Sequence, residues 1–266
     1  MLKRDWLGLL VAALVAAGCS TLQVAPSTEA QAALAPAGKL RVAFLAVSIY
    51  ATRDAVTGQY RGVAVDLGEA LARKLGVAFE AVPQSSLSEL LTAVKAGSVD
   101  VVLTGITPER AAVMDFSAPY MEVEQGLLAR AGAPVTRLED IDRAGVRVGV
   151  LEKASADALL TRQLKNAEVV RAPNIDQLIG LIAAGKADLV AGTKARLLEE
   201  AVKLPGSRVL DGRILVEPVG MGVPKGRHAA AAQYVGQFVE DAKASGLVAR
   251  AIANARLVGV VVAPPK

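Results

Sequence analysis

Hydrophobic and polar residues alternate along this chain in two patterns, one typical of buried strands and one typical of amphipathic helices. Short apolar runs predict strands at residues 39–46, 77–82, 146–151, 167–170 and 219–223. Between them, apolar positions spaced three and four residues apart predict helices at residues 66–75, 155–164, 229–244 and 247–255, the first with Asp66 as N-cap and Gly76 as C-cap. Strands that alternate with helices indicate an α/β fold with mostly parallel sheets covered on both faces.

One unit of this pattern occurs twice, at residues 89–105 and 177–193. Each copy reads as an amphipathic helix, an Ala-Gly stop, an aspartate and a short buried strand. The glycine and aspartate are Gly97 and Asp100 in the first copy and Gly185 and Asp188 in the second. The spacing Ala-Gly-x-x-Asp is also common between helices and strands in unrelated α/β folds, but the length of the match favours two related lobes.

The N-terminal segment predicts export. Residues 1–6 are net basic, residues 7–17 are an apolar run too short to span a bilayer comfortably, and small residues precede Cys19. Residues 1–18 therefore read as a signal peptide, and the site resembles a lipobox in which Cys19 is lipidated. The alternative is secretion with cleavage nearby and a free thiol. Residues 19–38 are rich in Ala, Pro and Ser without apolar periodicity, which predicts a flexible tether.

Composition excludes several classes of function. The 266 residues are 53% hydrophobic and 21% charged, enough for one large domain or two small ones. The net charge of +4 is spread without a long basic block, so we expect no nucleic-acid partner. A single cysteine excludes an intramolecular disulfide, and a single histidine excludes a histidine-rich metal site. No metal or cofactor is expected.

The most informative motif is the stretch of residues 99–110, followed by residues 115–120 (Asp-Phe-Ser-Ala-Pro-Tyr). An apolar run of strand length ends in Thr104-Gly105, and the turn after it presents Arg110. Open α/β sheets bind ligands beyond the carboxyl ends of their strands, and a guanidinium matches a carboxylate in a bidentate pair. The alternative is that Arg110 starts a helix and only pairs with a neighbouring acidic residue.

These residues resemble the signature of bacterial extracellular solute-binding proteins of family 3, the polar amino-acid receptors of ABC importers. Residues 58–67, 145–151 and 221–226 are similar to further segments of that family. The resemblance implies an α/β, two-lobe type II periplasmic binding protein fold with mixed, mostly parallel sheets and two crossover strands, near 121–125 and 215–219. Lobe 1 would comprise 39–122 and 218–262, and lobe 2 would comprise 123–217.

The resemblance also implies a site. In the family the arginine of this turn holds the ligand carboxylate, which is the role expected of Arg110. Thr104 and Gly105 end the same strand, where a hydroxyl or a backbone N–H can reach the ligand; the family often has serine or threonine in place of Gly105. From lobe 2, Ser155 opens a helix whose free N–H groups suit a carboxylate. Lys153 stands where glycine is usual, and either points to solvent or makes the site more cationic.

The largest departure from the family is Thr193. Amino-acid receptors of this family have an aspartate there that binds the ligand ammonium, and a threonine cannot neutralise a buried charge. Either another carboxylate such as Glu152 or Asp54 does so, or the ligand has no α-amine. Tyr50, where the family often places a ring over the ligand, and Ser48 beside it are further candidates; an exposed loop tyrosine is the alternative.

The sequence therefore predicts the extracytoplasmic substrate-binding component of an ABC importer, not an enzyme, that binds a small carboxylate-bearing solute in a cleft between lobes. Its partners would be permease subunits and, through lipid on Cys19, the membrane of a periplasmic or cell-envelope compartment, and we expect a monomer. One alternative is an exported cyclohexadienyl (arogenate or prephenate) dehydratase with Lys153 or Glu152 as proton donor. Another is a sensor that acts on a partner in trans. His228 is expected to be a solvated helix cap.

Overall fold

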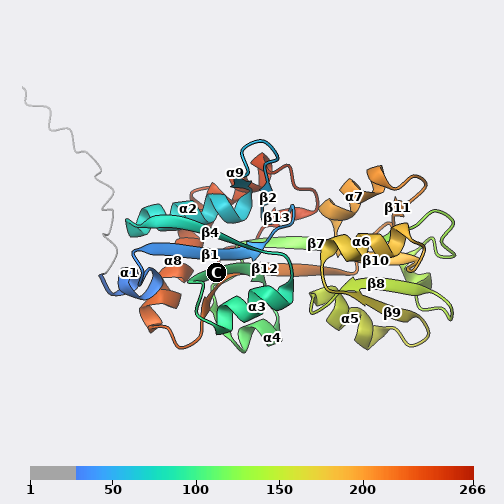
Figure 1. The fold of residues 1–266 in the computed structure, drawn as a ribbon, viewed down its shortest axis with the longest axis horizontal. Coiled ribbons are helices and arrows are strands. Elements are labelled where there is room, and N and C mark those ends of the chain that lie inside the picture. Colours follow the sequence, from blue (N-terminus) through green and yellow to red (C-terminus); the bar gives the residue numbers. More distant parts are fainter. Residues whose placement is uncertain (1–27) are drawn as a thin grey trace, which may run out of the picture.

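The structure, a computed structural model, describes residues 28–266. Two groups of helices and strands lie side by side and are joined by two long strands, β7 (Met121–Ala129) and β12 (Leu215–Pro224) (Figure 1). Buried apolar residues form one large cluster in the first group and two smaller clusters in the second. The exact limits proposed for the lobes, 39–122 with 218–262 and 123–217, remain a prediction.

The first group holds both ends of the described chain. Its helices are α1 (Thr28–Leu34), α2 (Val63–Leu75), α3 (Leu87–Lys95), α4 (Pro108–Ala111), α8 (Ala229–Ala244) and α9 (Leu247–Asn254). Its strands are β1 (Lys39–Leu45), β2 (Thr52–Arg53), β3 (Tyr60–Arg61), β4 (Ala78–Gln84), β5 (Val101–Gly105), β6 (Met114–Phe116) and β13 (Val260–Val262).

The second group lies between β7 and β12 in the chain. Its helices are the 3-10 helix η1 (Leu138–Asp140), α5 (Ser155–Gln163), α6 (Ile175–Ala183) and α7 (Lys194–Lys203). Its strands are β8 (Arg147–Leu151), β9 (Glu168–Ala172), β10 (Leu189–Thr193) and β11 (Arg208–Val209).

Apart from β2 and β3, which form a separate two-stranded sheet, the strands of both groups belong to one hydrogen-bonded sheet. Its main path runs β4-β1-β5-β12-β7-β10-β8-β9, with β6 paired to β12 and with β11 and β13 paired to β7. Within the large sheet, the pairs that involve neither β7 nor β12 are parallel: β1 with β4 and β5, and β8 with β9 and β10. Pairs that involve β7 or β12 are antiparallel, because these strands carry the chain from one group to the other and back. The predicted α/β class with a mixed sheet is confirmed, and its antiparallel pairs lie along the two connecting strands.

Helix α2 shows where local sequence reasoning was wrong. The helix begins at Val63 with Gly62 as N-cap, three residues before the expected cap Asp66. Gly62 has φ 139°, and a Cβ there would lie 2.7 Å from the carbonyl oxygen of Tyr50, so only glycine fits. Asp66 lies instead in the first turn, where the helix dipole favours a carboxylate, although burial raises its pKa.

Helix α1 corrects the predicted tether. Thr28–Leu34 falls within residues 19–38 yet forms a helix, with Leu34 fully buried. The Gln31 amide donates to the Leu75 carbonyl at 3.0 Å, and Arg227 donates to the Ala33 carbonyl at 2.8 Å. These contacts hold α1 against the first group, so residues 28–34 are helical and docked, contrary to the predicted flexible tether. Residues 1–27, including the signal peptide and Cys19, lie outside the described residues.

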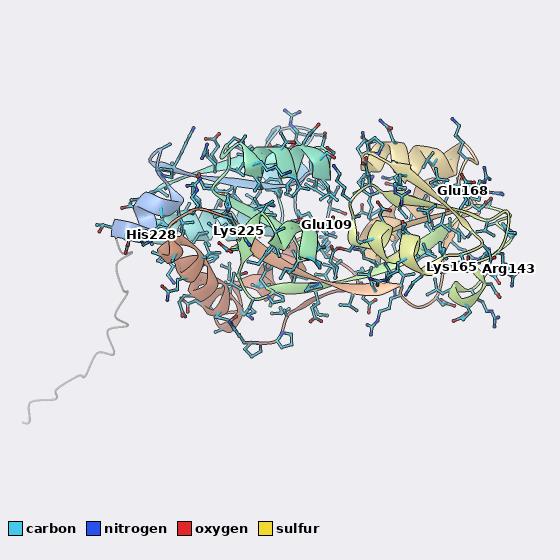
Figure 2. The ribbon with its side chains drawn as sticks, turned by 90° about the horizontal axis from the view of Figure 1, so that it is seen from below. Glu109, Arg143, Lys165, Glu168, Lys225 and His228 are labelled. Atoms are coloured by element: carbon cyan, nitrogen blue, oxygen red, sulfur yellow. The ribbon has the colours of Figure 1, made fainter. Side chains whose placement is uncertain are left out.

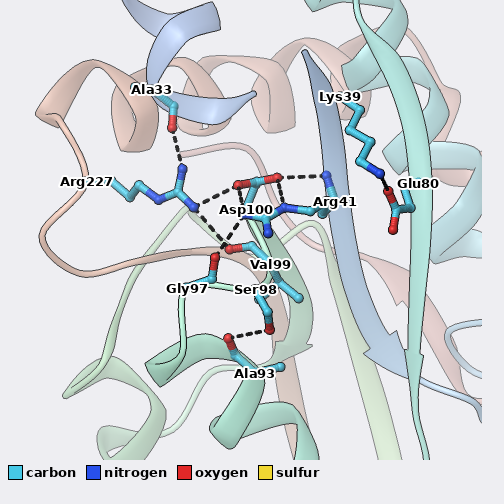
Figure 3. Close-up of polar contacts among 10 residues, drawn as sticks. All are labelled: Ala33, Lys39, Arg41, Glu80, Ala93, Gly97, Ser98, Val99, Asp100 and Arg227. Atoms are coloured by element: carbon cyan, nitrogen blue, oxygen red, sulfur yellow. Dashed lines mark hydrogen bonds and ion pairs between the residues drawn. The ribbon is translucent and has the colours of Figure 1, made fainter. Parts of the chain in front are cut away.

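The two aspartates of the repeated unit make equivalent hydrogen bonds in the two groups. Asp100 is fully buried and accepts hydrogen bonds from the guanidiniums of Arg41 and Arg227 (Figure 3). Its backbone N–H donates to the Arg41 carbonyl at 2.8 Å, while the Arg41 N–H donates to its carboxylate at 2.9 Å. The same exchange joins Asp188 to Arg147 at the same distances.

Asp188 takes a second arginine, Arg130, at 2.7 Å. Burial alone would raise the pKa of Asp188, but the hydrogen bonds from Arg147 and Arg130 outweigh it and hold the pKa below its usual value. Because each aspartate ties the start of a buried strand to the neighbouring strand, the repeated motif is a structural one.

Within the described residues no helix is long and apolar enough to cross a membrane. The same part of the chain brings together no group of three or more His, Cys, Asp or Glu side chains suited to a metal ion.

Candidate ligand-binding cleft

A cavity of about 80 Å³ lies between the two groups of elements, at the carboxyl ends of β1, β5, β8 and β10. Both groups line it, as does each connecting strand. Its lining residues are Leu45, Val47, Ile49, Tyr50, Leu87, Thr104, Arg110, Gln125, Leu151, Ala154, Ala156, Ile175, Ala191, Gly192, Thr193, Arg196 and Glu217. Four predicted site residues are among them: Arg110, Thr104, Tyr50 and Thr193.

Arg110 projects from the short helix α4 into this cavity. The helix is capped by Thr107, whose hydroxyl accepts from the Arg110 backbone N–H at 3.3 Å, with Pro108 at its first position. The side chain is 4% exposed. Its Nη1 donates to the Gly105 carbonyl at 2.9 Å, and its Nη2 donates across the cleft to the Lys153 carbonyl at 3.2 Å.

Glu217 is the carboxylate that the sequence analysis missed. It lies within β12, is 6% exposed and comes within 3.5 Å of Arg110 Nη1. The Gln125 side-chain amide and the Ser155 hydroxyl also donate to it. Ser155 therefore reaches the site through Glu217 and is absent from the cavity lining. The available signal was a lone acidic residue inside an otherwise apolar strand.

The pair formed by Arg110 and Glu217 gives one wall of the cavity two opposite charges. Three side-chain hydrogen bonds of Arg110 go to Gly105, Lys153 and Glu217. A guanidinium has five N–H donors, so among the described residues Arg110 keeps N–H donors that a ligand anion can use. A carboxylate likewise has about four lone-pair positions. The wall can therefore receive a negative and a positive group at the same time.

Gly105 is glycine because Glu217 occupies the space beside it. A Cβ on Gly105 would collide with the Glu217 carboxylate and lie 2.8 Å from Arg110 Nη1. The backbone carbonyl of Gly105 meanwhile orients the guanidinium. The departure from the serine or threonine usual in the family thus makes room for the Arg110–Glu217 pair.

We expect Gly105→Ser to separate Arg110 from Glu217, to weaken ligand binding at least about 10-fold and to cost about 1–3 kcal/mol of stability through overpacking. Thermal unfolding and titration calorimetry would measure both effects. Gly180→Ser is the matched control, because nothing lies within 4 Å of a Cβ at that helical glycine. Unchanged binding in Gly105→Ser would show that the pair is not part of the site.

Tyr50 and Thr104 contribute neutral hydroxyls. Burial raises the pKa of Tyr50 well above its ordinary value, the Glu217 carboxylate raises it further, and Arg110 acts in the opposite direction. The phenol therefore stays protonated at physiological pH. The Thr104 hydroxyl is buried and, among the described residues, has no hydrogen bond of good geometry, although it is close enough to the Tyr50 hydroxyl to affect its pKa.

Thr193 ends β10 and serves as the N-cap position of α7, without a side-chain cap hydrogen bond. One turn further along α7, Arg196 also lines the cavity, which the sequence did not indicate. Arg196 pairs with Glu200 at 2.8 Å and with Glu199 at 3.6 Å. Its charge is thus already offset by its own helix.

Lys153 and Ser48 lie outside the cavity lining. The Lys153 ammonium donates to the Ser88 hydroxyl at 2.9 Å, so only its backbone carbonyl reaches the site. Its φ of 64° explains why glycine is usual there. Ser48 lines a separate hollow with Arg61 and Asp66, and its hydroxyl is buried without a partner in the described structure. The structure therefore places neither side chain in the cavity, contrary to the prediction that both contact the ligand.

The acidic residues proposed as substitutes for the missing aspartate also lie elsewhere. Asp54 accepts hydrogen bonds in an exposed turn, chiefly from Thr57 and also from Val56 and Arg61, and these lower its pKa. Glu152 is absent from the cavity lining. His228 caps α8 through a hydrogen bond from the Ala230 N–H and contacts Glu29, as an exposed cap should.

Most of the exposed charged residues labelled in Figure 2 lie away from the boundary between the two groups. Figure 2 places His228 and Lys225 at one end of the molecule and Arg143, Lys165 and Glu168 at the other. Only Glu109, among the residues labelled there, comes near the boundary between the two groups. The charged groups that a ligand in the cavity would meet are those of the lining itself, Arg110, Arg196 and Glu217.

Two α/β groups with a charged cavity between them, joined by two strands, define a two-lobed solute receptor. The sequence pattern of the bacterial extracellular solute-binding proteins, family 3, matches residues 47–254, and the chain belongs to this family. The predicted family and type II periplasmic binding protein fold are thereby confirmed, as is the role of substrate-binding component.

Similar proteins agree with this assignment. A probable histidine-binding protein of Neisseria gonorrhoeae is 29% identical over 199 residues, which cover 71% of this chain and 72% of that protein. A glutamine-binding protein of Geobacillus stearothermophilus is 24% identical over 247 residues, covering 84% and 93%. The crystal structure of an ancestral amino acid-binding protein, described as a precursor of cyclohexadienyl dehydratase, matches with a TM-score of 0.72 at 26% identity, covering 85% and 98%.

Proposed function

We propose that this protein binds a free α-amino acid between its lobes and delivers it to the permease of an ABC importer. The observation that carries the proposal is the buried pair of Arg110 and Glu217 on one wall of the cavity. Arg110 would hold the ligand carboxylate in a bidentate pair. Glu217 would accept the ligand ammonium, which an α-amino acid carries one carbon away.

This arrangement answers the problem raised by Thr193. A buried ammonium needs a carboxylate partner, and Glu217 supplies one from the connecting strand β12 rather than from the end of β10. The argument for an amine-free acid therefore loses its basis. Backbone N–H groups and the hydroxyl of Thr193 remain for the neutral contacts.

We further propose that the protein is a receptor rather than an enzyme. A dehydratase needs a proton donor in the cleft. The ammonium of Lys153 is engaged by Ser88 outside the cavity, and Glu152 does not line it. Tyr50 does line it, but its raised pKa makes it a poor acid. Turnover of prephenate or arogenate by the purified protein would contradict this part of the proposal.

The location of the protein follows from the family and from the N-terminal sequence. Family members are extracellular solute-binding proteins. We propose that lipid on Cys19 anchors this one to the cell envelope; that residue lies outside the described part of the chain. The monomeric state and the ABC permease partner belong to the same proposal.

The test compares α-amino acids with their deaminated and 2-hydroxy counterparts in a thermal unfolding assay. A ligand at 100 times its dissociation constant should add about 2.7 kcal/mol to the free energy of unfolding. In a protein of this size, each kcal/mol raises the melting temperature by roughly 2–4 °C. We expect the amino acids alone to stabilise the protein. Equal or greater stabilisation by the amine-free acids would mean that Glu217 does not bind an ammonium.

A further inference from the structure

We propose that the cavity selects amino acids with small, uncharged, apolar side chains. This inference rests on the proposed function and adds the class of ligand. It is drawn from the part of the lining that Arg110 and Glu217 do not form.

The charges of the lining are already balanced. Arg110 and Glu217 are the pair assigned to the backbone of the ligand. The third charged residue, Arg196, is neutralised by Glu199 and Glu200. A lysine or arginine ligand would bring a third charge into a site with no carboxylate left for it, and an unpaired buried charge is expensive.

The remaining surface is mostly apolar and comes from both groups. The first group contributes Leu45 at the end of β1, Val47 and Ile49 just after it, and Leu87 at the start of α3. The second group contributes Leu151, Ala154, Ile175 and Ala191. Burying apolar ligand surface against such a wall is favourable by about 25 cal/mol per Å². A polar side chain would lose its hydration without gaining equivalent partners.

The size of the cavity sets the length of the side chain. Its volume of about 80 Å³ equals room for roughly six water-sized groups, at about 10–15 Å³ each. Alanine has six non-hydrogen atoms and leucine nine, whereas lysine has ten and arginine twelve, so the volume favours the smallest aliphatic amino acids. It leaves no place for the extended side chain of arginine or lysine.

The polar atoms left over are few and mostly neutral. They are the hydroxyls of Thr104, Thr193 and Tyr50, the side-chain carbonyl of Gln125, and Arg196 Nε, which is buried without a partner in the described residues. Arg196 Nε makes glutamate and glutamine the strongest competitors. The proposal therefore requires glutamate and glutamine in particular to bind weakly, although Arg196 Nε could donate a hydrogen bond to their side chains.

Titration calorimetry on the purified protein would compare alanine, valine, leucine and methionine with glutamate, glutamine, histidine, lysine and arginine. We expect at least one of the first four to bind about 100-fold more tightly than every member of the second set. Binding of any charged or amide amino acid as tightly as the best aliphatic one would overturn the inference. If no amino acid bound, the proposed function itself would be wrong.

A substitution that reverses the selectivity gives an independent test. Ile175 lines the cavity at the first position of α6, where a helix tolerates an acidic residue well because of its dipole. We expect Ile175→Asp to shift the affinity ratio of leucine to lysine by at least 10-fold toward lysine. Val202→Asp, at a position 88% exposed on α7 of the same group, is the charge-matched control and should leave the ratio unchanged. An unaltered ratio in Ile175→Asp would show that the ligand side chain does not lie against this wall.

Discussion

Arg110→Ala is expected to weaken ligand binding by at least about 100-fold. The variant removes the only guanidinium in the described lining that is directed at both the Gly105 carbonyl and Glu217, and with it a charge-assisted bidentate contact. It also leaves Glu217 buried without its cation, which typically costs about 3–5 kcal/mol of stability. Titration calorimetry would measure the first effect, and urea unfolding the second.

A double variant separates the two effects. Arg110→Met combined with Glu217→Gln removes both charges together, so the stability should recover most of its loss because replacing a buried pair with neutral groups is often nearly neutral. Binding should stay lost. Lys165→Ala, a change at the far end of the molecule (Figure 2), is the control for removing a cation. Recovery of binding in the double variant would show that neither residue recognises the ligand.

Asp100→Ala is expected to lower the free energy of unfolding by about 3–5 kcal/mol while leaving the cavity intact. The variant leaves the guanidiniums of Arg41 and Arg227 without the carboxylate with which both pair, and it removes an acceptor for the Arg41 N–H (Figure 3). Arg227 also donates to the Ala33 carbonyl, so the docking of α1 should weaken as well.

Urea unfolding would measure this loss, and the dissociation constant of a bound amino acid would show whether the cavity survives. Asp211→Ala, at an exposed position, should change neither quantity. A loss below 1 kcal/mol for Asp100→Ala would mean that the cluster contributes little to stability beyond its desolvation cost.

The sequence predicted what depends on local pattern. Alternating apolar runs located most of the strands and helices, because burial on a sheet or a helix face imposes a short period on the chain. The turn that ends in Arg110 was predicted to meet a ligand, and the structure places that side chain in the cavity. The repeated Gly-x-x-Asp unit was found because it is local in both copies.

What the sequence did not predict depends on contacts between distant residues. Glu217 meets Arg110 across 107 positions and Gln125 across 92, and no periodicity reports such a meeting. Helix α1 looked like a linker because only two of its seven residues are buried, and its docking uses Arg227 from the other end of the chain. The N-cap of α2 depends on the Tyr50 carbonyl above Gly62.

The place of Glu217 on a connecting strand has a mechanical consequence. In a rotation of one lobe against the other, atoms near the axis move least and atoms far from it move most. β7 and β12 join the lobes and pair with each other from Leu215 to Val219, so an axis through them passes close to Glu217 and its donor Gln125. The charge that we assign to the ligand ammonium would then keep its position throughout opening and closing.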